Sequence, residues 1–464
     1  MSAKAPQFTV AAALSVLVVA GGLGLMVFAP DVLPRQQMLA FGLVVLTIGL
    51  FAIGELPEYL TALLFFLLAI LFSIAPPAVV FSGFQSTAFW LVFGGLVIGV
   101  ALDSTGLGAR IATRVAGRLD GTYLLLVSAM VVAGLVFAFL MPSAMGRCLL
   151  LIPIATALSE HFGFRTGSRG RTGIVLAVTL GTLMPAFAIL PANVPNMVFV
   201  GLAETQLGIT VLFAEYLILH FPVLGLLKSV ALIFLINHFY ADEPSHKHRC
   251  SCEHLPAMQR SERILAAVLV VLLLLWFTDA VHHVSPAWIA LAGALFLLLP
   301  GVGVVSHETF SARINLNSLL FVAGVLGVGG LIEYSGLGKT LGGELVDRLP
   351  LDPQSPFISY MAVALATTVA AIAATLPGVP AVFTSLTEQI AALSGFSVES
   401  ALMLQVLGFS TVVFAYQSAP LVVALQVANI KVRDCWKLVL ALAAISIIVL
   451  WPLNFLWWRF LGWV

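Results

Sequence analysis

The chain has 464 residues, of which 61% are hydrophobic and 9% are charged. Soluble domains carry roughly 25% charged residues, so a chain with so few could not cover a water-facing surface. Lysine plus arginine and aspartate plus glutamate number 21 each, and this balance excludes the basic excess of a nucleic-acid binder. The composition therefore predicts an all-α polytopic membrane protein, most of which is surrounded by lipid.

Apolar runs of about 20 residues, long enough to cross roughly 30 Å of hydrocarbon, follow one another along the chain. The first, at 8–28, lacks a strongly basic start and a clear cleavage site, so we interpret it as a retained helix rather than a signal peptide. Eleven spanning helices are predicted, at 8–28, 37–54, 57–75, 85–103, 173–203, 207–239, 263–281, 285–301, 315–336, 398–428 and 434–461.

Two further apolar stretches, 122–159 and 356–395, are interrupted near their middle. The first contains Met141-Pro142-Ser143-Ala144-Met145-Gly146 and the second contains Thr375-Leu376-Pro377-Gly378-Val379-Pro380. Proline removes a backbone donor and glycine loosens a helix, so a tight reversal is favoured over one very long helix. Because non-helical backbone at membrane depth must be buried in protein or line a cavity, we predict two re-entrant helical hairpins.

A glycine-rich span occurs twice, ending in Asp103-Ser104-Thr105-Gly106-Leu107-Gly108 and in Glu333-Tyr334-Ser335-Gly336-Leu337-Gly338. Each copy follows two spans and precedes a broken hairpin, an interrupted span and one further span. The glycines alone also fit close helix packing, but packing does not explain hairpins in matching places. Each half contains an odd number of crossings, so we predict two inverted repeats, which are typical of secondary transporters with a site near the membrane midplane.

This pattern divides the chain into an N-terminal helix (1–36), a first repeat (37–240), a cytoplasmic linker (241–262) and a second repeat (263–464). With the N-terminus inside, most lysines and arginines fall on the inner side, as the positive-inside rule requires. The inner set includes Arg110, Arg114, Arg118, Arg165, Arg169, Arg171, Arg260, Arg263, Arg313, Lys431 and Arg433; the outer set is Arg35, Lys339, Arg348 and Arg459. We therefore expect a multi-pass protein of a bacterial cytoplasmic (inner) membrane.

Two of the predicted spans are also interrupted. Span 173–203 contains Pro185 and then Pro191-Ala192-Asn193-Val194-Pro195-Asn196, and span 398–428 contains Tyr416-Gln417-Ser418-Ala419-Pro420. Each interruption frees backbone N–H and C=O groups, and the N-terminus of each half-helix carries partial positive charge. Two hairpin tips and two broken spans that converge on one cavity would form a site for a small anion.

With these four elements, nearly the whole chain from about residue 37 resembles the divalent anion/sodium symporter family, which carries dicarboxylates, citrate or sulfate. The most specific matches are the span ending in Asp103 to Gly108, the hairpin ending in Leu151-Ile152-Pro153-Ile154, and the Val194-Pro195-Asn196 break. The resemblance implies a small anionic substrate and a homodimer with a scaffold part and a moving transport part. It places substrate binding at Ser143, Gly146, Arg147, Asn193, Pro195, Asn196, Thr375, Gln417 and Ser418, and cation binding at Ser143, Ala144, Gly378 and Val379.

The sequence departs from the family at both hairpin tips. Family members carry Ser-Asn-Thr there, which supplies oxygens for sodium and for the substrate carboxylate. The first tip keeps Ser143 but has Ala144 and Met145, and the second offers Gly378, Val379 and Pro380, without a side-chain oxygen. Backbone carbonyls would have to supply most of a sodium site, so sodium and protons both stay open as coupling ions.

Arg147 lies next to the first tip. An arginine at membrane depth is costly and usually faces a cavity with a partner. One interpretation is that Arg147 pairs with the anionic substrate and replaces the charge that sodium would bring. The alternative is an arginine that snorkels toward the membrane surface or pairs with a nearby acid.

Other charged residues have simpler alternatives. Glu215, His220 and Lys228 lie in the span 207–239 and suit proton coupling, but they do not share a helix face and also fit interface or snorkelling positions. Asp103 and Glu333, at matched helix ends, fit helix caps better than proton relays. The histidines and cysteines of 246–254 suit zinc or copper, but they have no second pair at the usual spacing and so also fit a solvated linker.

No His-Glu-x-x-His, Gly-x-Ser-x-Gly or Walker-type motif occurs, so neither an enzyme nor an ATP-driven pump is expected, and no cofactor or metal. We predict a secondary active transporter of a small anion, an organic carboxylate or sulfur oxyanion, that works by alternating access. The alternatives are an inorganic ion or proton-exchange carrier of the same superfamily, and a non-transporting membrane scaffold or sensor.

Overall fold

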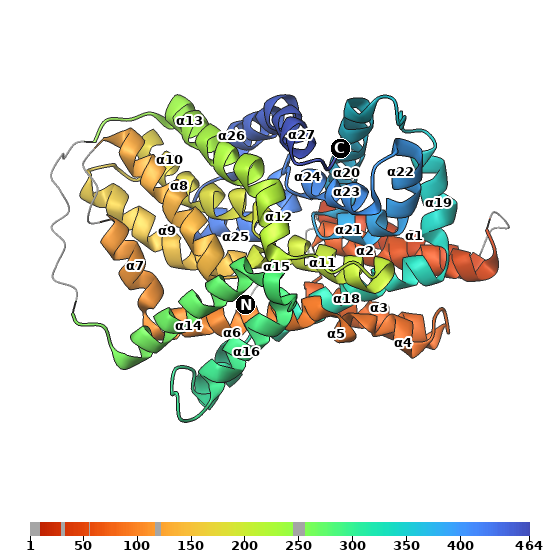
Figure 1. Cartoon of the computed structure of the whole chain (residues 1–464), viewed down its shortest axis with the longest axis horizontal. Coiled ribbons are helices and arrows are strands. Elements are labelled where there is room, and N and C mark those ends of the chain that lie inside the picture. Colours follow the sequence, from red (N-terminus) through yellow and green to blue (C-terminus); the bar gives the residue numbers. More distant parts are fainter. Residues whose placement is uncertain (1–9, 29–32, 55, 117–121, 245–255) are drawn as a thin grey trace, which may run out of the picture.

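A computed structural model describes residues 10–28, 33–54, 56–116, 122–244 and 256–464 (Figure 1). Every regular element in these ranges is a helix, which confirms the all-α fold class. The helices of the N-terminal segment and first repeat are α1 (Val10–Phe28), α2 (Arg35–Ile53), α3 (Glu58–Leu71), α4 (Pro77–Val80), α5 (Ser82–Gln85), α6 (Thr87–Thr105), α7 (Leu107–Ala116), α8 (Tyr123–Leu140), α9 (Ala144–His161), α10 (Arg169–Leu183), α11 (Val194–Leu207), α12 (Phe213–His220) and α13 (Lys228–Tyr240).

The second half of the chain follows the linker. Its helices are α14 (Arg260–Phe277), α15 (Asp279–His282), α16 (Pro286–Leu298), α17 (His307–Arg313), α18 (Leu316–Tyr334), α19 (Leu337–Val346), α20 (Pro356–Ala374), α21 (Gly378–Phe383), α22 (Thr387–Ser394), α23 (Val398–Met403), α24 (Gln405–Phe409), α25 (Ala419–Val427), α26 (Val432–Ile445) and α27 (Trp451–Phe460). Short 3-10 turns at Pro185–Ala188, Leu190–Ala192, Thr384–Leu386 and Ala415–Gln417 lie in or beside the interruptions.

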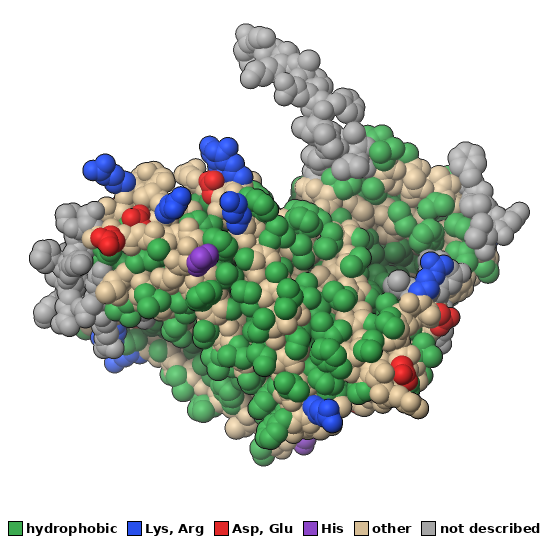
Figure 2. Space-filling model, turned by 90° about the horizontal axis from the view of Figure 1, so that it is seen from above, with side chains coloured by type: hydrophobic (Ala, Val, Ile, Leu, Met, Phe, Trp, Pro, Cys, Tyr) green, Lys and Arg blue, Asp and Glu red, His purple; other side chains and the backbone are tan. Residues whose placement is uncertain are grey.

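The part of the chain that the structure describes contains eight helical stretches long and apolar enough to cross a membrane, and four shorter apolar ones. Two of the eight, α8 and α20, are the first arms of the expected hairpins. Figure 2 shows hydrophobic side chains over most of the face seen from above, with charged side chains gathered toward its edges. An apolar surface of this kind suits a lipid environment; the count of eleven crossings stays a prediction.

The order of elements repeats between the halves. A long glycine-rich helix (α6, α18) leads to a short helix (α7, α19), a hairpin, a broken span and a final long helix. Both final helices contain a π-helical segment, Phe221–Leu227 and Ser446–Leu450, which the sequence did not lead us to expect. Proline explains the location: Pro222 lies in the first segment and Pro452 lies two residues after the second, and proline cannot donate the usual helical hydrogen bond.

The glycine-rich helix of each half packs closely against a helix of the other half. A Cβ on Gly94 of α6 would lie 2.8 Å from the backbone of Ala290 in α16, and a Cβ on Gly324 of α18 would lie 2.6 Å from the Ala62 side chain in α3. Helices this close exclude any larger residue at these positions. The packing role considered for the glycines is therefore present, and each half supplies one such helix to the other.

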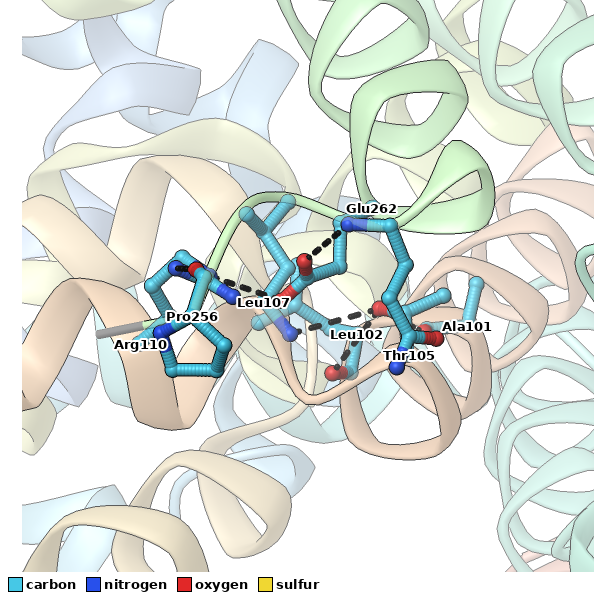
Figure 3. A network of polar contacts seen from close by, with 8 residues as sticks. Ala101, Leu102, Thr105, Leu107, Arg110, Pro256 and Glu262 are labelled. Carbon is cyan, nitrogen blue, oxygen red and sulfur yellow. Dashed lines mark hydrogen bonds and ion pairs between the residues drawn. The ribbon is translucent and has the colours of Figure 1, made fainter.

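An ion pair joins the halves at the end of α6 (Figure 3). Gly106 adopts φ 76° and ends α6, and the Thr105 hydroxyl accepts a hydrogen bond from Leu107 N (3.4 Å) at the turn into α7. On α7, Arg110 Nε lies 2.8 Å from Glu262 Oε1 on α14, and Arg110 also donates to the Pro256 carbonyl oxygen (2.7 Å). The ion pair thus connects the first half to the start of the second.

Candidate functional site

The structure contains all four predicted interruptions. The hairpin tips are residues 141–143 and 375–377, and the broken spans lose regular α-helix at 184–193 and 410–418. Helix α9, the second arm of the first hairpin, packs against α25, which follows the break in the other half; α11 packs against α21 in the same crosswise manner. The helix that follows the break in each half therefore packs against the second hairpin arm of the other half.

Both hairpin tips lie against the middle of a glycine-rich helix. A Cβ on Gly95, near the centre of α6, would lie 2.7 Å from the Pro142 side chain. At the second tip, Thr375 and Pro377 line a small apolar crevice of about 10 Å³ together with Val325, near the centre of α18. Each tip is thus level with the midpoint of a long apolar helix.

Arg147 is fully buried and binds the first hairpin tip to the first break. Its Nη1 donates to the carbonyl oxygens of Met141 (2.5 Å) and Ala192 (2.8 Å). Its Nε donates to Thr182 Oγ1 (3.0 Å), and its Nη2 donates to the Thr182 carbonyl oxygen (3.0 Å). Four of the five N–H groups of a guanidinium are therefore engaged by protein oxygens.

These contacts differ from both interpretations made for Arg147 from the sequence. Burial excludes snorkelling, and no carboxylate among the described residues forms an ion pair with it. Its acceptors are neutral oxygens from three separate segments, and none of its surface faces an open cavity. Direct pairing with an anion would require this cluster to open, and it stays a prediction.

Two buried asparagines hold the first break in shape. Asn193 Oδ1 accepts from Asn196 N (3.0 Å) and caps α11, while Asn193 Nδ2 donates to the Ala186 carbonyl oxygen (3.1 Å). Asn196 Nδ2 donates to the carbonyl oxygens of Phe187 (3.1 Å) and Ile189 (2.9 Å). Each of these three carbonyl oxygens also accepts a second hydrogen bond, from Ile189 N, the Tyr216 hydroxyl and Ala192 N respectively, so the irregular backbone is held at several points. Pro195, with no N–H to satisfy, occupies the first turn of α11.

The remaining predicted residues of the first tip form its turn. Ser143 Oγ accepts from Gly146 N (3.1 Å) and caps α9, whose first residue is Ala144. A Cβ on Gly146 would lie 2.3 Å from Met141 Cε, so a side chain there would have to displace the end of the Met141 side chain. Ser143 is partly exposed and its hydroxyl hydrogen is free to point at a ligand.

At the second break, Gln417 and Ser418 lie at the start of α25. Gln417 Oε1 accepts from Val413 N (2.8 Å) and Phe414 N (2.7 Å), while its Nε2 is buried and has no hydrogen-bond partner in the described part of the chain. Ser418 is the N-cap residue of α25 and is 8% exposed. The Tyr416 hydroxyl donates to the Ile372 carbonyl oxygen (2.8 Å), which ties this break to the second hairpin.

The second tip is strained and lacks side-chain oxygens beyond Thr375. Thr375 adopts φ 62° and ψ 172°, a conformation that is nearly exclusive to glycine. Gly378 and Val379, expected near a cation, are buried in α21. Thr375 lies among residues of α18 and α21.

Lys228 has a role that the sequence analysis did not identify. It is 1% exposed and its Nζ donates to the Ser410 carbonyl oxygen (2.6 Å), at the end of α24 where the second break begins. The signal available in the sequence was a lysine inside a long apolar segment without a neighbouring acid. Thr182, which binds Arg147 through both of its oxygens, carried no such signal.

The other charged candidates lie away from the tips. His220 is fully buried between the rings of Tyr216 (4.6 Å) and Trp458 (5.6 Å), and neither of its ring nitrogens has a hydrogen-bond partner among the described residues. The Asp103 carbonyl oxygen accepts from Gly106 N at the end of α6. No metal-binding group of three His, Cys, Asp or Glu occurs in the described ranges, and the His/Cys cluster at 246–254 lies outside them.

Comparisons with known proteins agree with this architecture. The family model for the sodium:sulfate symporter transmembrane region matches residues 9–464. A membrane protein of Cupriavidus necator is 26% identical over 404 residues, covering 82% of this chain and 77% of the relative. A sodium-dependent dicarboxylate transporter, SdcS, of Staphylococcus aureus is 22% identical over 352 residues, covering 70% of this chain and 67% of that one.

A solved structure supports the fold independently of the sequence matches. The YdaH transporter of Alcanivorax borkumensis has a TM-score of 0.54 and 16% identity to this chain, and the match covers 93% of this chain and 99% of that one. Paired hairpins, broken spans and an apolar exterior define a multi-pass membrane transporter and not an enzyme. The chain belongs to the sodium:sulfate symporter family. This confirms the resemblance to the divalent anion/sodium symporters predicted from the sequence.

Proposed function

We propose that this protein is a secondary active carrier of a small anion, either an organic di- or tricarboxylate or a sulfur oxyanion, and that it works by alternating access. The supporting observation is the crosswise pairing of α9 with α25 and of α11 with α21, in a chain that matches the family from residue 9 to residue 464. Re-entrant hairpins, a homodimer and a place in the bacterial cytoplasmic membrane belong to the same proposal.

The proposed anion lies where α9 and α25 begin. Ser143 and Ser418 are the N-cap residues of these helices, and the helix N-termini carry partial positive charge. Gln417 Nε2 supplies a buried N–H without a protein acceptor. Thr375 provides a hydroxyl from the second hairpin tip when the carrier closes around its substrate. Asn193, Pro195, Asn196 and Gly146 shape the site, because their polar groups are already engaged within the turns.

Ligand-dependent thermal stabilisation tests the substrate class. The purified protein is heated with mono-, di- and tricarboxylates, sulfate, sulfonates and phosphate, because a ligand that binds the folded state raises its melting temperature. We expect one class of divalent anion to stabilise the protein and to drive saturable counterflow in proteoliposomes. The proposal would be contradicted if none of these anions raised the melting temperature and none were transported in the proteoliposomes.

Gln417→Glu tests the site itself. The variant keeps an oxygen for Val413 N and Phe414 N but places negative charge where Nε2 was. We expect the anion affinity to fall by at least about tenfold, since like charges brought together cost several kcal/mol. Gln426→Glu, on the exposed side of the same helix α25, is the matched control and keeps wild-type affinity. Equal affinities for the two variants would remove Gln417 from the site.

A further inference from the structure

Each of the two helix breaks holds one buried cationic side chain. Arg147 lies at the first, bound to the carbonyl oxygens of Met141, Thr182 and Ala192. Lys228 lies at the second, bound to the carbonyl oxygen of Ser410. Both are at most 1% exposed, and no described carboxylate pairs with either. A charge buried without a counter-ion is costly, so some favourable interaction must hold both cations in place.

Three of the four carbonyl oxygens that bind these side chains lie at the ends of α-helices. Met141 directly follows α8, Thr182 lies in the last turn of α10, and Ser410 directly follows α24. Carbonyl groups at the end of a helix lack intrahelical donors and carry the negative end of the helix dipole. In transporters built from broken helices, such carbonyls bind the small cations that accompany the substrate. Here the guanidinium and the ammonium occupy carbonyl groups of that kind.

The two cations also lie at matching places of the two halves. The first break separates α10 from α11 and the second separates α24 from α25, and these are equivalent spans of the repeat. Arg147 belongs to the hairpin arm that packs on α25, and Lys228 is the first residue of α13, directly after the π-helical segment. Both side chains come from the first half, so the correspondence lies in the helix-end carbonyl groups that they bind, Thr182 in the last turn of α10 and Ser410 directly after α24.

We propose that Arg147 and Lys228 are built-in cations that occupy helix-end carbonyl groups at the two breaks in place of diffusible ones, so that anion binding is independent of sodium. The statement that anion binding is independent of sodium rests on the proposed function, because it takes a small anion as the ligand. Positive charge fixed beside the two breaks then favours anion binding, and it does not leave the protein with the substrate.

Replacement of sodium by choline is the first test. We expect the wild-type protein to bind its anion with equal affinity in the two buffers. Arg147→Ala and Lys228→Ala each remove one of the two cations from its carbonyl oxygens. We expect the anion affinity of each variant to fall by about 5- to 150-fold, the usual range of coupling between two sites. Added guanidinium should restore the anion affinity of Arg147→Ala, and added methylammonium or sodium should restore that of Lys228→Ala. Lys437→Ala, an exposed lysine on α26, is the control and keeps wild-type affinity.

A second readout does not need the anion. Guanidinium alone should raise the melting temperature of Arg147→Ala and leave that of the wild type unchanged. If either alanine variant fails to fold, Arg147→Lys and Lys228→Arg keep the charge and should bind the anion equally in sodium and choline. Wild-type binding that requires sodium, or variants indifferent to added cations, would overturn the built-in cations. The proposed function alone would be rejected if the wild type bound no anion while guanidinium still stabilised the Arg147→Ala variant.

Discussion

Asn196 shows how a single side chain replaces the hydrogen bonds of a broken helix. It is fully buried, and its Nδ2 donates to two carbonyl oxygens of the first break, those of Phe187 and Ile189. Asn196→Ala removes one of two donors from each, because the Tyr216 hydroxyl still donates to Phe187 O and Ala192 N to Ile189 O. We expect the two lost hydrogen bonds to cost about 1–3 kcal/mol of stability. Asn237→Ala is the control, because Asn237 donates only to Ile233 of its own helix. Melting curves in detergent compare the two, and equal losses would contradict a special role for Asn196.

The residues at the tips and breaks could be located from the sequence, but their partners could not. Proline and glycine in apolar segments indicated where the helices end, and the cost of a buried charge singled out Arg147. Its acceptors are backbone carbonyls of Met141, Thr182 and Ala192, and every residue type has a carbonyl. Such a partner leaves no residue-type signal, so only three-dimensional packing identifies it.

At the scale of elements, the first hairpin is fitted closely to the broken span beside it. A Cβ on Gly134 of α8 would lie 2.6 Å from Thr182 N of α10, the residue that binds Arg147. We expect Gly134→Ala to separate α8 from α10, to weaken the Arg147 contacts and to cost about 1–3 kcal/mol as overpacking does. Gly99→Ala in α6 meets its nearest atom at 3.5 Å and is the control. The melting temperatures of both variants test this. A Gly134→Ala variant that melts at the same temperature as Gly99→Ala would contradict the close fit of α8 to α10.

The ion pair between α7 and α14 predicts a dependence on pH. The hydrogen bond from Arg110 holds the pKa of the Glu262 carboxyl below its ordinary value. A depressed folded-state pKa stabilises the protein above the unfolded-state pKa, about 4.3 for glutamate, and this stabilisation is lost as the pH falls through the folded-state value. Glu262→Gln should therefore melt below the wild type at pH 7, and the difference should shrink below about pH 4.

Melting temperatures of wild type and Glu262→Gln, measured side by side from neutral to acid pH, check this. Glu308→Gln on α17 is the control, because Glu308 is exposed and its carboxylate accepts only from Ser306 (3.3 Å). A difference between Glu262→Gln and wild type that stays constant with pH would mean that the carboxylate charge is not the cause.

The elements themselves were predicted unevenly. Both hairpins lie close to their expected limits, since α8 begins at Tyr123 and α20 at Pro356, and their tips lie at Pro142 and Pro377. Local composition determines such breaks, so the sequence is enough to find them. The π-helical segments at Phe221–Leu227 and Ser446–Leu450 were not predicted, because one extra residue per turn leaves the apolar pattern of a buried helix unchanged.

For the whole molecule, the central prediction is that the two halves have opposite orientations. Thr166, at the base of the first hairpin, and Gln354, at the base of the second, are both exposed. If the halves are inverted and the N-terminus is inside, the first base faces the cytoplasm and the second faces outward, in agreement with the positive-inside rule. Both bases would share one side if the number of crossings between them were even.

Cysteine labelling from one side of the membrane tests this orientation. Thr166→Cys and Gln354→Cys are placed in a background without the four natural cysteines. A membrane-impermeant maleimide should label Gln354→Cys in intact cells and leave Thr166→Cys untouched until the membrane is opened. Inside-out vesicles should reverse the pattern, and this serves as the control for intrinsic reactivity. Labelling of both residues from outside would contradict the inverted arrangement, and with it a carrier whose two equivalent breaks approach a central site from opposite sides.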